Sequence, residues 1–204
     1  MIDLRDVLFA PDSAKADIIS NVGIAASPFT GGVQITELPG AKWKLTFSYD
    51  SLSAKYGRQM KAIKAMLRGG AVVAHIYDLS YMPRRSAEPG TPLVKGANQS
   101  GAVLAVDGLT PNAAVYEIGD QVSYLCSDGM YRMHMVTANV SADATGNANI
   151  PIQPPLRNAP VDNAAVASVR PAVSCYLSGG GEVSIDGMLH AASFEFTEAL
   201  YGMN

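Results

Sequence analysis

Apolar and polar residues alternate along two stretches near the start of the chain, as they do in strands that bury one face. One stretch covers residues 33–38 and the other covers residues 43–49. Pro39-Gly40 stands between them and is a turn pair, because proline presets one turn angle and glycine tolerates the left-handed one. We therefore predict a hairpin of two half-buried strands, with Trp43 and Phe47 in the core.

The periodicity becomes helical directly after this hairpin. Asp50 or Ser51 can cap the start of a helix with a side-chain oxygen. Gly69-Gly70 ends the pattern, since glycine adopts the left-handed conformation that terminates many helices. We predict one helix over about residues 51–68, with four apolar residues on its buried face: Tyr56, Met60, Ile63 and Leu67.

The other segments predict short strands and irregular connections. Residues 1–30 are irregular apart from a candidate strand at 22–25, and residues 27–32 have the composition of a loop. From residue 92 onward, turn pairs such as Asp107-Gly108 separate short apolar runs at the spacing of small barrels and sandwiches. Four prolines then predict an edge strand or a linker, at positions 151, 154, 155 and 160. Further strands are predicted at residues 71–79, 172–177, 183–187 and 193–198.

These elements predict a mainly β fold in two parts. Residues 1–92 and 161–204 form one discontinuous β-sandwich domain, which carries the helix. Residues 93–160 form an inserted small β-barrel or sandwich. The 19 glycines and 12 prolines agree with many turns and short strands.

Composition points to a protein that is covered by partners. Charged residues make up 16% of the 204-residue chain, below the usual share of about 25%. The formal net charge of −3 gives no indication of nucleic-acid binding. No apolar run approaches the roughly 20 residues that cross a bilayer, and the start of the chain is unlike a secretory signal. We expect a soluble protein with no membrane association and with surface buried against other subunits.

The sequence contains no recognisable catalytic or metal-binding motif. The three histidines, His75, His134 and His190, match no metal-ligand spacing and are predicted to be structural. Residues 143–147 resemble a calcium loop, but the twelfth position holds Pro154 in place of a carboxylate, so we expect a turn. We predict no enzyme activity, no cofactor and no metal, although a Ser-His-Asp set that is dispersed in the sequence stays open.

Two further features have structural interpretations. Residues 178–181 are glycine-rich but lack the lysine of a phosphate-binding loop, so we expect a hairpin tip. Cys126 and Cys175 stand in apolar runs and are predicted to be reduced, packed thiols, with a disulfide as the alternative.

One face of the predicted helix is basic and lacks compensating acids. No acidic residue occurs within residues 51–69. Like charges this close repel one another, so the face is either simply solvated or meets an acidic partner, a neighbouring subunit or nucleic acid. We favour the subunit, and the candidate subunit-interface residues, called here the basic stripe, are Arg58, Lys61, Lys64 and Arg68.

Several segments in order resemble tail-tip proteins of tailed bacteriophages, of the distal tail or minor tail kind. They are residues 43–49 leading into the helix, residues 94–101, Tyr131-Arg132-Met133, and residues 143–146 before 152–157. The resemblance covers about residues 28–200 and implies a tail-tube-like β domain. It also implies a homo-oligomeric ring, often a hexamer, at the end of the tail tube.

The resemblance further implies a location in the virion tail, after assembly in the bacterial host cytoplasm. Partners would be other tail proteins, namely the tube, the hub and the fibres. No catalytic residue and no cofactor carries over, because the shared motifs are structural.

Three other functions fit parts of the sequence. A receptor- or carbohydrate-binding module of the virion would use exposed aromatic residues. A head-to-tail connector would differ from a tail ring only in its position and symmetry. A small hydrolase would need a pocket with a nucleophile, a base and an orienting acid. The aromatics available to the first alternative are Tyr77, Tyr81, Tyr116 and Tyr131.

Overall fold

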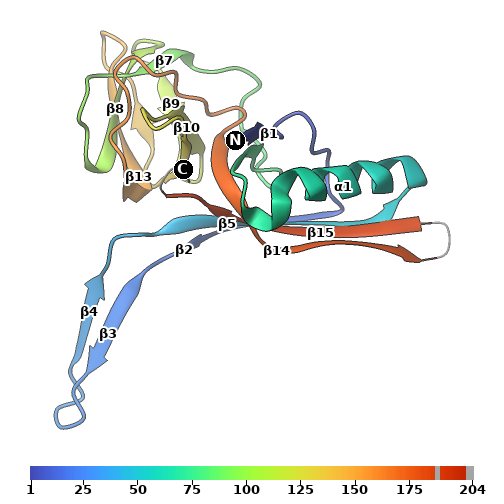
Figure 1. Ribbon diagram of the computed structural model, residues 1–204. Helices are drawn as coiled ribbons and strands as arrows, with labels where there is room; N and C mark the ends of the chain where they lie inside the picture. The colour runs from blue at the N-terminus through green and yellow to red at the C-terminus, as the bar shows by residue number, and fades with distance from the viewer. Residues whose placement is uncertain (187–188, 201–204) are drawn as a thin grey trace.

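The computed structural model describes residues 1–186 and 189–200. Strands account for 51% of the residues and helices for 9%, which confirms the predicted mainly β fold. Figure 1 shows three parts: a long sheet with one helix, a smaller β unit, and a two-stranded arm that extends away from both.

The long sheet has six strands and holds one of the two large cores. Its inward residues come from alternate positions of the strand that was predicted at 43–49, so Trp43 and Phe47 are 1% and 0% exposed. The burial predicted for these two residues is therefore confirmed. In spatial order the strands are β1 (Ile2–Asp3), β6 (Ala74–Tyr77), β14 (Ala172–Asp186), β15 (Leu189–Glu198), β5 (Lys42–Leu52) and β2 (Ser13–Ile19).

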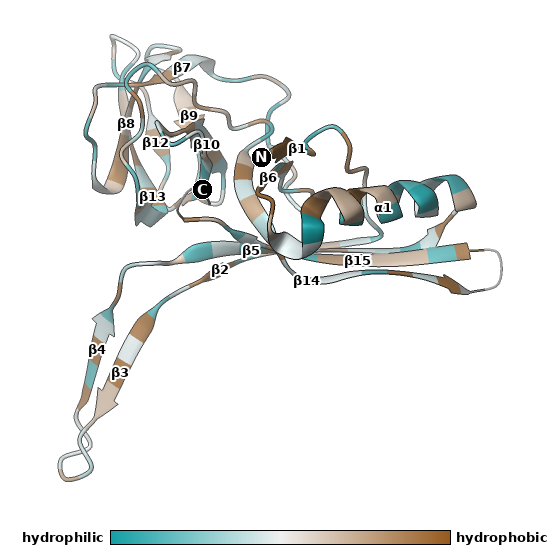
Figure 2. Ribbon diagram, in the orientation of Figure 1, coloured by the Kyte–Doolittle hydropathy of each residue, from teal (hydrophilic) through white to brown (hydrophobic). Residues whose placement is uncertain are grey.

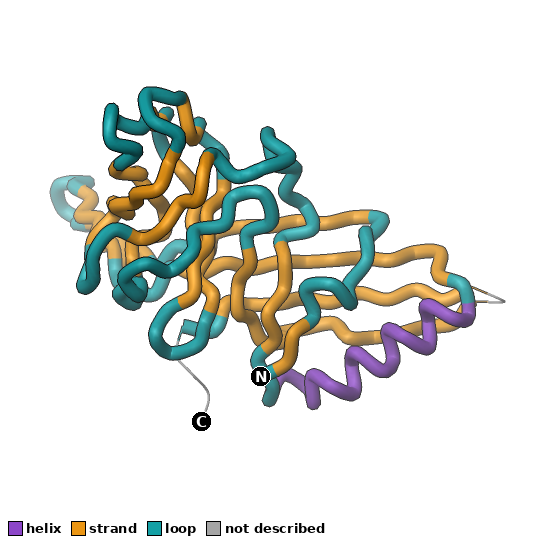
Figure 3. The backbone as a smooth tube through the Cα atoms, turned by 90° about the horizontal axis from the view of Figure 1, so that it is seen from above, coloured by secondary structure: helices purple, strands orange, loops and turns teal. Residues whose placement is uncertain are grey.

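The helix α1 (Ala54–Leu67) covers one face of this sheet and is followed by the short 3-10 turn η1 (Arg68–Gly70). Seen from above in Figure 3, it runs obliquely along the strands. It starts later than predicted because Asp50 and Ser51 still belong to β5, and its N-cap is Ser53. The left-handed residue at its end is Arg68, with φ 48°, one position before the predicted glycine.

The buried face of α1 differs from the prediction at one position. Tyr56 is 42% exposed and packs beside Phe9, with ring centroids 4.8 Å apart. Gly57 is buried on this face and packs closely against β15. A Cβ at residue 57 would lie only 2.3 Å from Cγ of His190. The rest of the predicted face is buried: Met60, Ile63 and Leu67.

The smaller unit is built from the short strands that the turn signals predicted. A separate apolar core fills it, which includes Leu104, Tyr124 and Ile150. Bridges from Ala165 and Ala167 also reach this unit. Its independence as a folding domain over residues 93–160 stays a prediction. In spatial order its sheet contains β10 (Gln121–Leu125), β11 (Tyr131–Val136), β13 (Ala148–Leu156), β8 (Gly101–Leu109) and β7 (Gly90–Val94), beside the pair β12 (Val140–Ser141) and β9 (Ala114–Tyr116).

The prolines of β13 do not form the predicted edge or linker, because β13 lies in the middle of its sheet. Regular pairing with β8 is interrupted between Pro151 and Leu156, where the prolines lack N–H donors. Their carbonyls are still used: Pro151 accepts from the amide of Thr137, and Pro154 accepts from Nδ1 of His134 at 2.6 Å. Proline therefore fits in this central strand because its carbonyl oxygens still accept hydrogen bonds, although it has no N–H to donate.

Residues 178–181 are not a hairpin tip, since they lie within β14. The pairing of β14 with β15 shifts register on either side of Gly180, which is typical of β-bulges. Gly180 and Gly181 both have left-handed φ angles, of 69° and 73°. The glycines therefore bend a long strand instead of ending it.

The predicted hairpin between residues 33–38 and 43–49 is also wrong. β4 (Val33–Glu37) pairs with β3 (Val22–Ala26), while β5 pairs with β2. The chain thus runs outward along β2 and β3, turns in the predicted loop at 27–32, and returns along β4 and β5. Pro39-Gly40 lies in the short connection between β4 and β5, where the chain bends in Figure 1. The prediction that residues 1–30 are irregular is wrong where β1 and β2 lie, while β3 occupies the position of the candidate strand at 22–25.

Candidate interaction surfaces

The arm, defined here as β3 and β4 with their connecting loop, is a ribbon with two unlike faces. Cross-strand partners share a face, and Ile24 stands opposite Ile35. These two residues are 69% and 68% exposed. The other face carries Ala25 opposite Gln34. Hydropathy in Figure 2 shows brown segments along both strands of the arm. The apolar face comprises Val22, Ile24, Ala26, Val33 and Ile35, with the charged Glu37 opposite Val22 at its base.

This exposure corrects the expectation that residues 33–38 are half buried. Every residue of β4 is exposed, because among the described residues β3 is its only strand partner and no further layer covers the ribbon. A two-stranded hairpin without such a layer is marginally stable in water.

The tip of the arm presents one large aromatic side chain. Phe29 is 96% exposed, more than any other large apolar residue described. The loop beneath it is ordered by its own hydrogen bonds: the amide of Ser27 donates to the carbonyl of Gly32 at 2.8 Å, and the amide of Gly31 donates back to Ser27 at 3.0 Å. A closed loop thus holds an unburied phenyl ring at the far end of the arm.

A cavity of about 340 Å³ lies at the base of the arm, between it and β13. Leu38, Pro39 and Ala41 line it from the arm side, and Pro155 and Leu156 line it from β13. Its remaining lining residues are Glu37, Gly40, Pro154, Arg157, Asn158 and Leu200.

Behind this cavity, a buried polar joint connects the two sheets. Arg157 forms an ion pair with Glu198 of β15, and the Arg157 side chain is 10% exposed while that of Glu198 is fully buried. The second carboxylate oxygen of Glu198 accepts from the amide of Trp43 at 3.0 Å. The Trp43 indole Nε1 donates to the carbonyl of Met133 on β11 at 2.7 Å. The joint fixes the arm base relative to the smaller unit.

The two charges of the joint are held in balance by burial and by each other. Burial raises the pKa of Glu198, and the Arg157 guanidinium opposes that rise. Burial likewise lowers the pKa of Arg157, opposed by Glu198. The Nε atom of Arg157 is buried and has no acceptor among the residues that the structure describes. One donor at the cavity wall is thus left unused.

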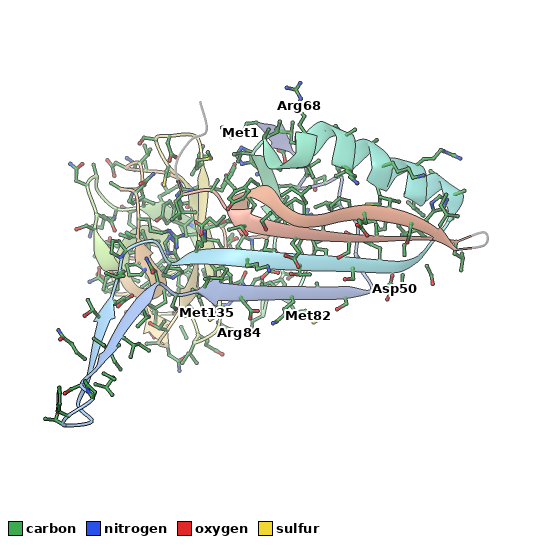
Figure 4. The ribbon with its side chains drawn as sticks, turned by 60° about the horizontal axis from the view of Figure 1, so that its bottom comes forward. Met1, Asp50, Arg68, Met82, Arg84 and Met135 are labelled. Carbon is green, nitrogen blue, oxygen red and sulfur yellow. The ribbon has the colours of Figure 1, made fainter. Side chains whose placement is uncertain are left out.

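The basic stripe lies on α1 where it was predicted, and all four side chains are exposed. None of them forms an ion pair within the described parts of the chain. Arg68 points away from the sheet at the end of α1 in Figure 4. The assignment of Arg58, Lys61, Lys64 and Arg68 to a subunit interface stays a prediction.

The structure does bring a serine and a histidine together, a pair that the sequence could not locate. Nδ1 of His75 lies 2.8 Å from Oγ of Ser174. Ser174 is fully buried, and its Oγ also accepts from the amide of Tyr131. The nearby Asp3 is engaged by Arg5 at 2.6 Å, and this contact lowers the pKa of Asp3 to about 2. The pair is packed into the sheet, where a substrate has no access to the hydroxyl.

His134 and the cysteines are packed inside the molecule as well. His134 is fully buried between Tyr124, whose hydroxyl lies 2.9 Å from Nε2, and the carbonyl of Pro154. Burial lowers the pKa of its imidazole to about 3. Cys126 and Cys175 are free and buried, which agrees with reduced, packed thiols. Burial raises the pKa of both thiols and disfavours the reactive thiolate.

Of the aromatic residues considered for a carbohydrate site, Tyr116 is 1% exposed, and Tyr77, Tyr81 and Tyr131 are half-buried. The guanidinium of Arg170 lies 4.2 Å from the ring centroid of Tyr77, and that of Arg5 lies 4.9 Å from that of Tyr131. These cations occupy positions near two of the rings where a sugar would stack.

The loop at residues 143–147 forms the expected turn. Asp143 accepts from the amide of Thr145 at 2.8 Å and from that of Asn147 at 2.9 Å, and these contacts lower the pKa of its carboxyl. Gly146 supplies the left-handed residue, with φ 79°. Within residues 1–186 and 189–200, no three acidic, histidine or cysteine side chains gather into a metal-binding group.

Comparison with known proteins leaves the surfaces above as the main guide to function. No family model matches the sequence, and no curated protein matches it. Among the residues described, no helix has the length and apolar character needed to span a membrane.

Sequence reasoning missed the arm and the cavity for different reasons. The alternation of Val22 and Ile24, followed by a Ser-Pro loop and by Val33 and Ile35, was a usable signal for the arm. The cavity had no such signal, because its walls come from segments more than one hundred residues apart.

Proposed function

We propose that this protein is a structural subunit of a bacteriophage tail, one of the copies that form a ring at the distal end of the tail tube. The observation that carries this proposal is the arm, whose apolar face is exposed on an otherwise packed molecule. The resemblance of residues 28–200 to tail-tip proteins supplies the phage context.

The arm favours an assembly role on physical grounds. Apolar residues that recur on one face of a projecting ribbon mark an interaction site, because monomeric proteins rarely leave such contiguous patches open. Burial of Ile24, Ile35 and their neighbours against another copy would both stabilise the ribbon and join the copies. A contact between unlike surfaces closes into a ring when its rotation allows, and the resemblance implies six copies.

The basic stripe supports the same role. Its charges have no acidic partner among the described residues, so a neighbouring subunit that offers acids would relieve their mutual repulsion. Such contacts accelerate association and fix register more than they add affinity. The basic stripe would then speed the association of subunits, and the apolar face of the arm would stabilise the contact once it has formed.

A structural role also fits the interior chemistry. Ser174, whose hydroxyl lies beside His75, is buried, and His134 is held neutral within a core. The Ser174 hydroxyl and the His134 imidazole thus pack the interior of the fold. We accordingly propose a non-catalytic protein.

A matched pair of double variants tests the assembly role. Ile24→Thr with Ile35→Thr makes the apolar face of the arm polar and keeps β-branched residues in both strands. Ala25→Thr with Gln34→Thr changes the opposite face by the same number of residues. Mass photometry over a concentration series should show that the first variant stays monomeric while the second assembles like the unmodified protein. Equal assembly of both variants would show that the apolar face of the arm is not part of the interface between copies.

A further inference from the structure

We infer that the arm tip of one copy docks in the arm-base cavity of a second copy, and that Phe29 is the side chain that enters it. This inference rests on the proposed function, since it names the contact by which neighbouring copies join. It makes the contact head-to-tail, with unlike surfaces on the two partners.

The two surfaces are complementary in chemistry. The cavity of about 340 Å³ has apolar walls at Leu38, Pro155 and Leu156. Phe29 is 96% exposed and has no apolar neighbour to cover it at the tip. An aromatic ring that fills an apolar pocket is the commonest kind of anchor in protein interfaces. The cavity thus offers the exposed phenyl ring the burial that its own chain does not.

The arm is long enough to reach from its base into an adjacent copy. About ten residues separate the end of β2 from Phe29, which at about 3.3 Å per residue spans roughly 30 Å. A compact chain of this length has a radius of gyration of about 17 Å, so this reach carries the tip well beyond one such radius. Figure 1 shows that the arm carries its tip away from its own base, so the cavity it meets belongs to a neighbour. Repetition of this contact gives a ring or a filament.

Disulfide trapping between two single variants tests the contact directly. Thr30→Cys places a thiol beside Phe29 at the tip and keeps the phenyl ring, and Leu38→Cys places one at the cavity. The native Cys126 and Cys175 are buried and do not compete. When the two variants are mixed and oxidised, a covalent dimer that contains one chain of each should form and dissociate on reduction. Neither variant alone should give this dimer.

Three outcomes would overturn the inference. Cross-linking of Thr30→Cys to itself would mean a tip-to-tip contact. Cross-linking of the mixture only after removal of residues 201–204 would mean that the chain's own end fills the cavity. No cross-link in a mixture that still forms closed rings would leave the proposed function standing and exclude this contact, whereas a mixture without any self-association would contradict the proposed function itself.

A polar substitution gives an independent readout. Phe29→Ser should weaken self-association roughly tenfold or more, measured by analytical ultracentrifugation, since it removes the anchor of the interface. The matched control is Met82→Ser, which removes a side chain that is 90% exposed elsewhere on the surface and should leave association unchanged. Equal association constants for the two variants would overturn the inference.

Discussion

Replacement of Trp43 tests whether the joint between the two sheets stabilises the protein as its geometry implies. The side chain is 1% exposed, and its indole Nε1 donates to Met133 of the other sheet at 2.7 Å. The pairing of β11 with β13 ends at Met135 and Gln153, and the Met133 carbonyl accepts from the Trp43 indole beyond that end.

The expected loss of stability has two parts. Trp43→Ala should lower the free energy of unfolding by about 3–5 kcal/mol, the usual cost when a large buried aromatic is truncated. Trp43→Phe keeps most of the apolar volume but leaves the Met133 carbonyl without its donor, which should cost about 1–3 kcal/mol. The loss of unfolding free energy in Trp43→Phe therefore reports the hydrogen bond, and the additional loss in Trp43→Ala reports the packing of the ring.

Urea unfolding followed by far-ultraviolet circular dichroism measures both losses. Tryptophan fluorescence is unsuitable because Trp43 is the single tryptophan of the chain. Met82→Ala, at a residue that is 90% exposed, serves as the control and should change stability by less than about 0.5 kcal/mol. A loss below roughly 1 kcal/mol for Trp43→Ala would refute the assignment of this residue to the core.

Three further predictions address pH, assembly and packing. Because the pKa of buried His134 is lowered to about 3 while the unfolded chain takes up a proton near 6.5, its contribution should reduce the free energy of unfolding by about 2 kcal/mol from pH 7 to pH 5. Urea titrations at the two pH values should show this decrease, and a His134→Gln variant with the same decrease would contradict it. Lys61→Glu with Lys64→Glu should leave the fold intact and slow assembly, most strongly at low salt, in time-resolved light scattering. Unchanged kinetics would mean that the stripe is simply solvated. Gly57→Ala should destabilise the protein by roughly 1–3 kcal/mol despite the better helix propensity of alanine, since the new Cβ would lie 2.3 Å from His190. A rise in the urea midpoint would show that His190 moves aside without cost.

The alternation of residues predicted strands well but not their partners. Residues 43–49 and 33–37 show the same pattern, yet the first stretch is in a core and the second is exposed along its whole length. Periodicity records which residues share a face, whereas the layer that covers the face is set by tertiary structure. For the arm, the described residues supply no such layer.

Glycine and proline misled the prediction where tertiary contacts overrode their local preferences. Gly180 looked like part of a turn but forms a bulge within β14. Pro154 looked like an edge residue but lies in a central strand, where its carbonyl accepts from His134. The conformation at such positions depends on hydrogen-bond donors and packing contacts from distant segments, so a local sequence pattern cannot predict it.

The basic stripe illustrates what a sequence can supply about a site. The spacing of Arg58, Lys61, Lys64 and Arg68 predicted one exposed face, and the structure places all four at the surface. Its partner is not a property of the single chain, so the interface itself stays a prediction. The cavity is the opposite case, because only the folded arrangement of β13 and the arm base creates it.

We propose that copies of this chain form a closed ring in a phage tail. Electron microscopy of the assembled particle is the direct test of this ring. Particles that contain the protein, decorated with antibody fragments against it and averaged at the tail tip, should show several copies in one ring with rotational symmetry. Each arm should reach toward the adjacent copy. Isolated single copies in the particle, or label absent from the tail, would contradict the account.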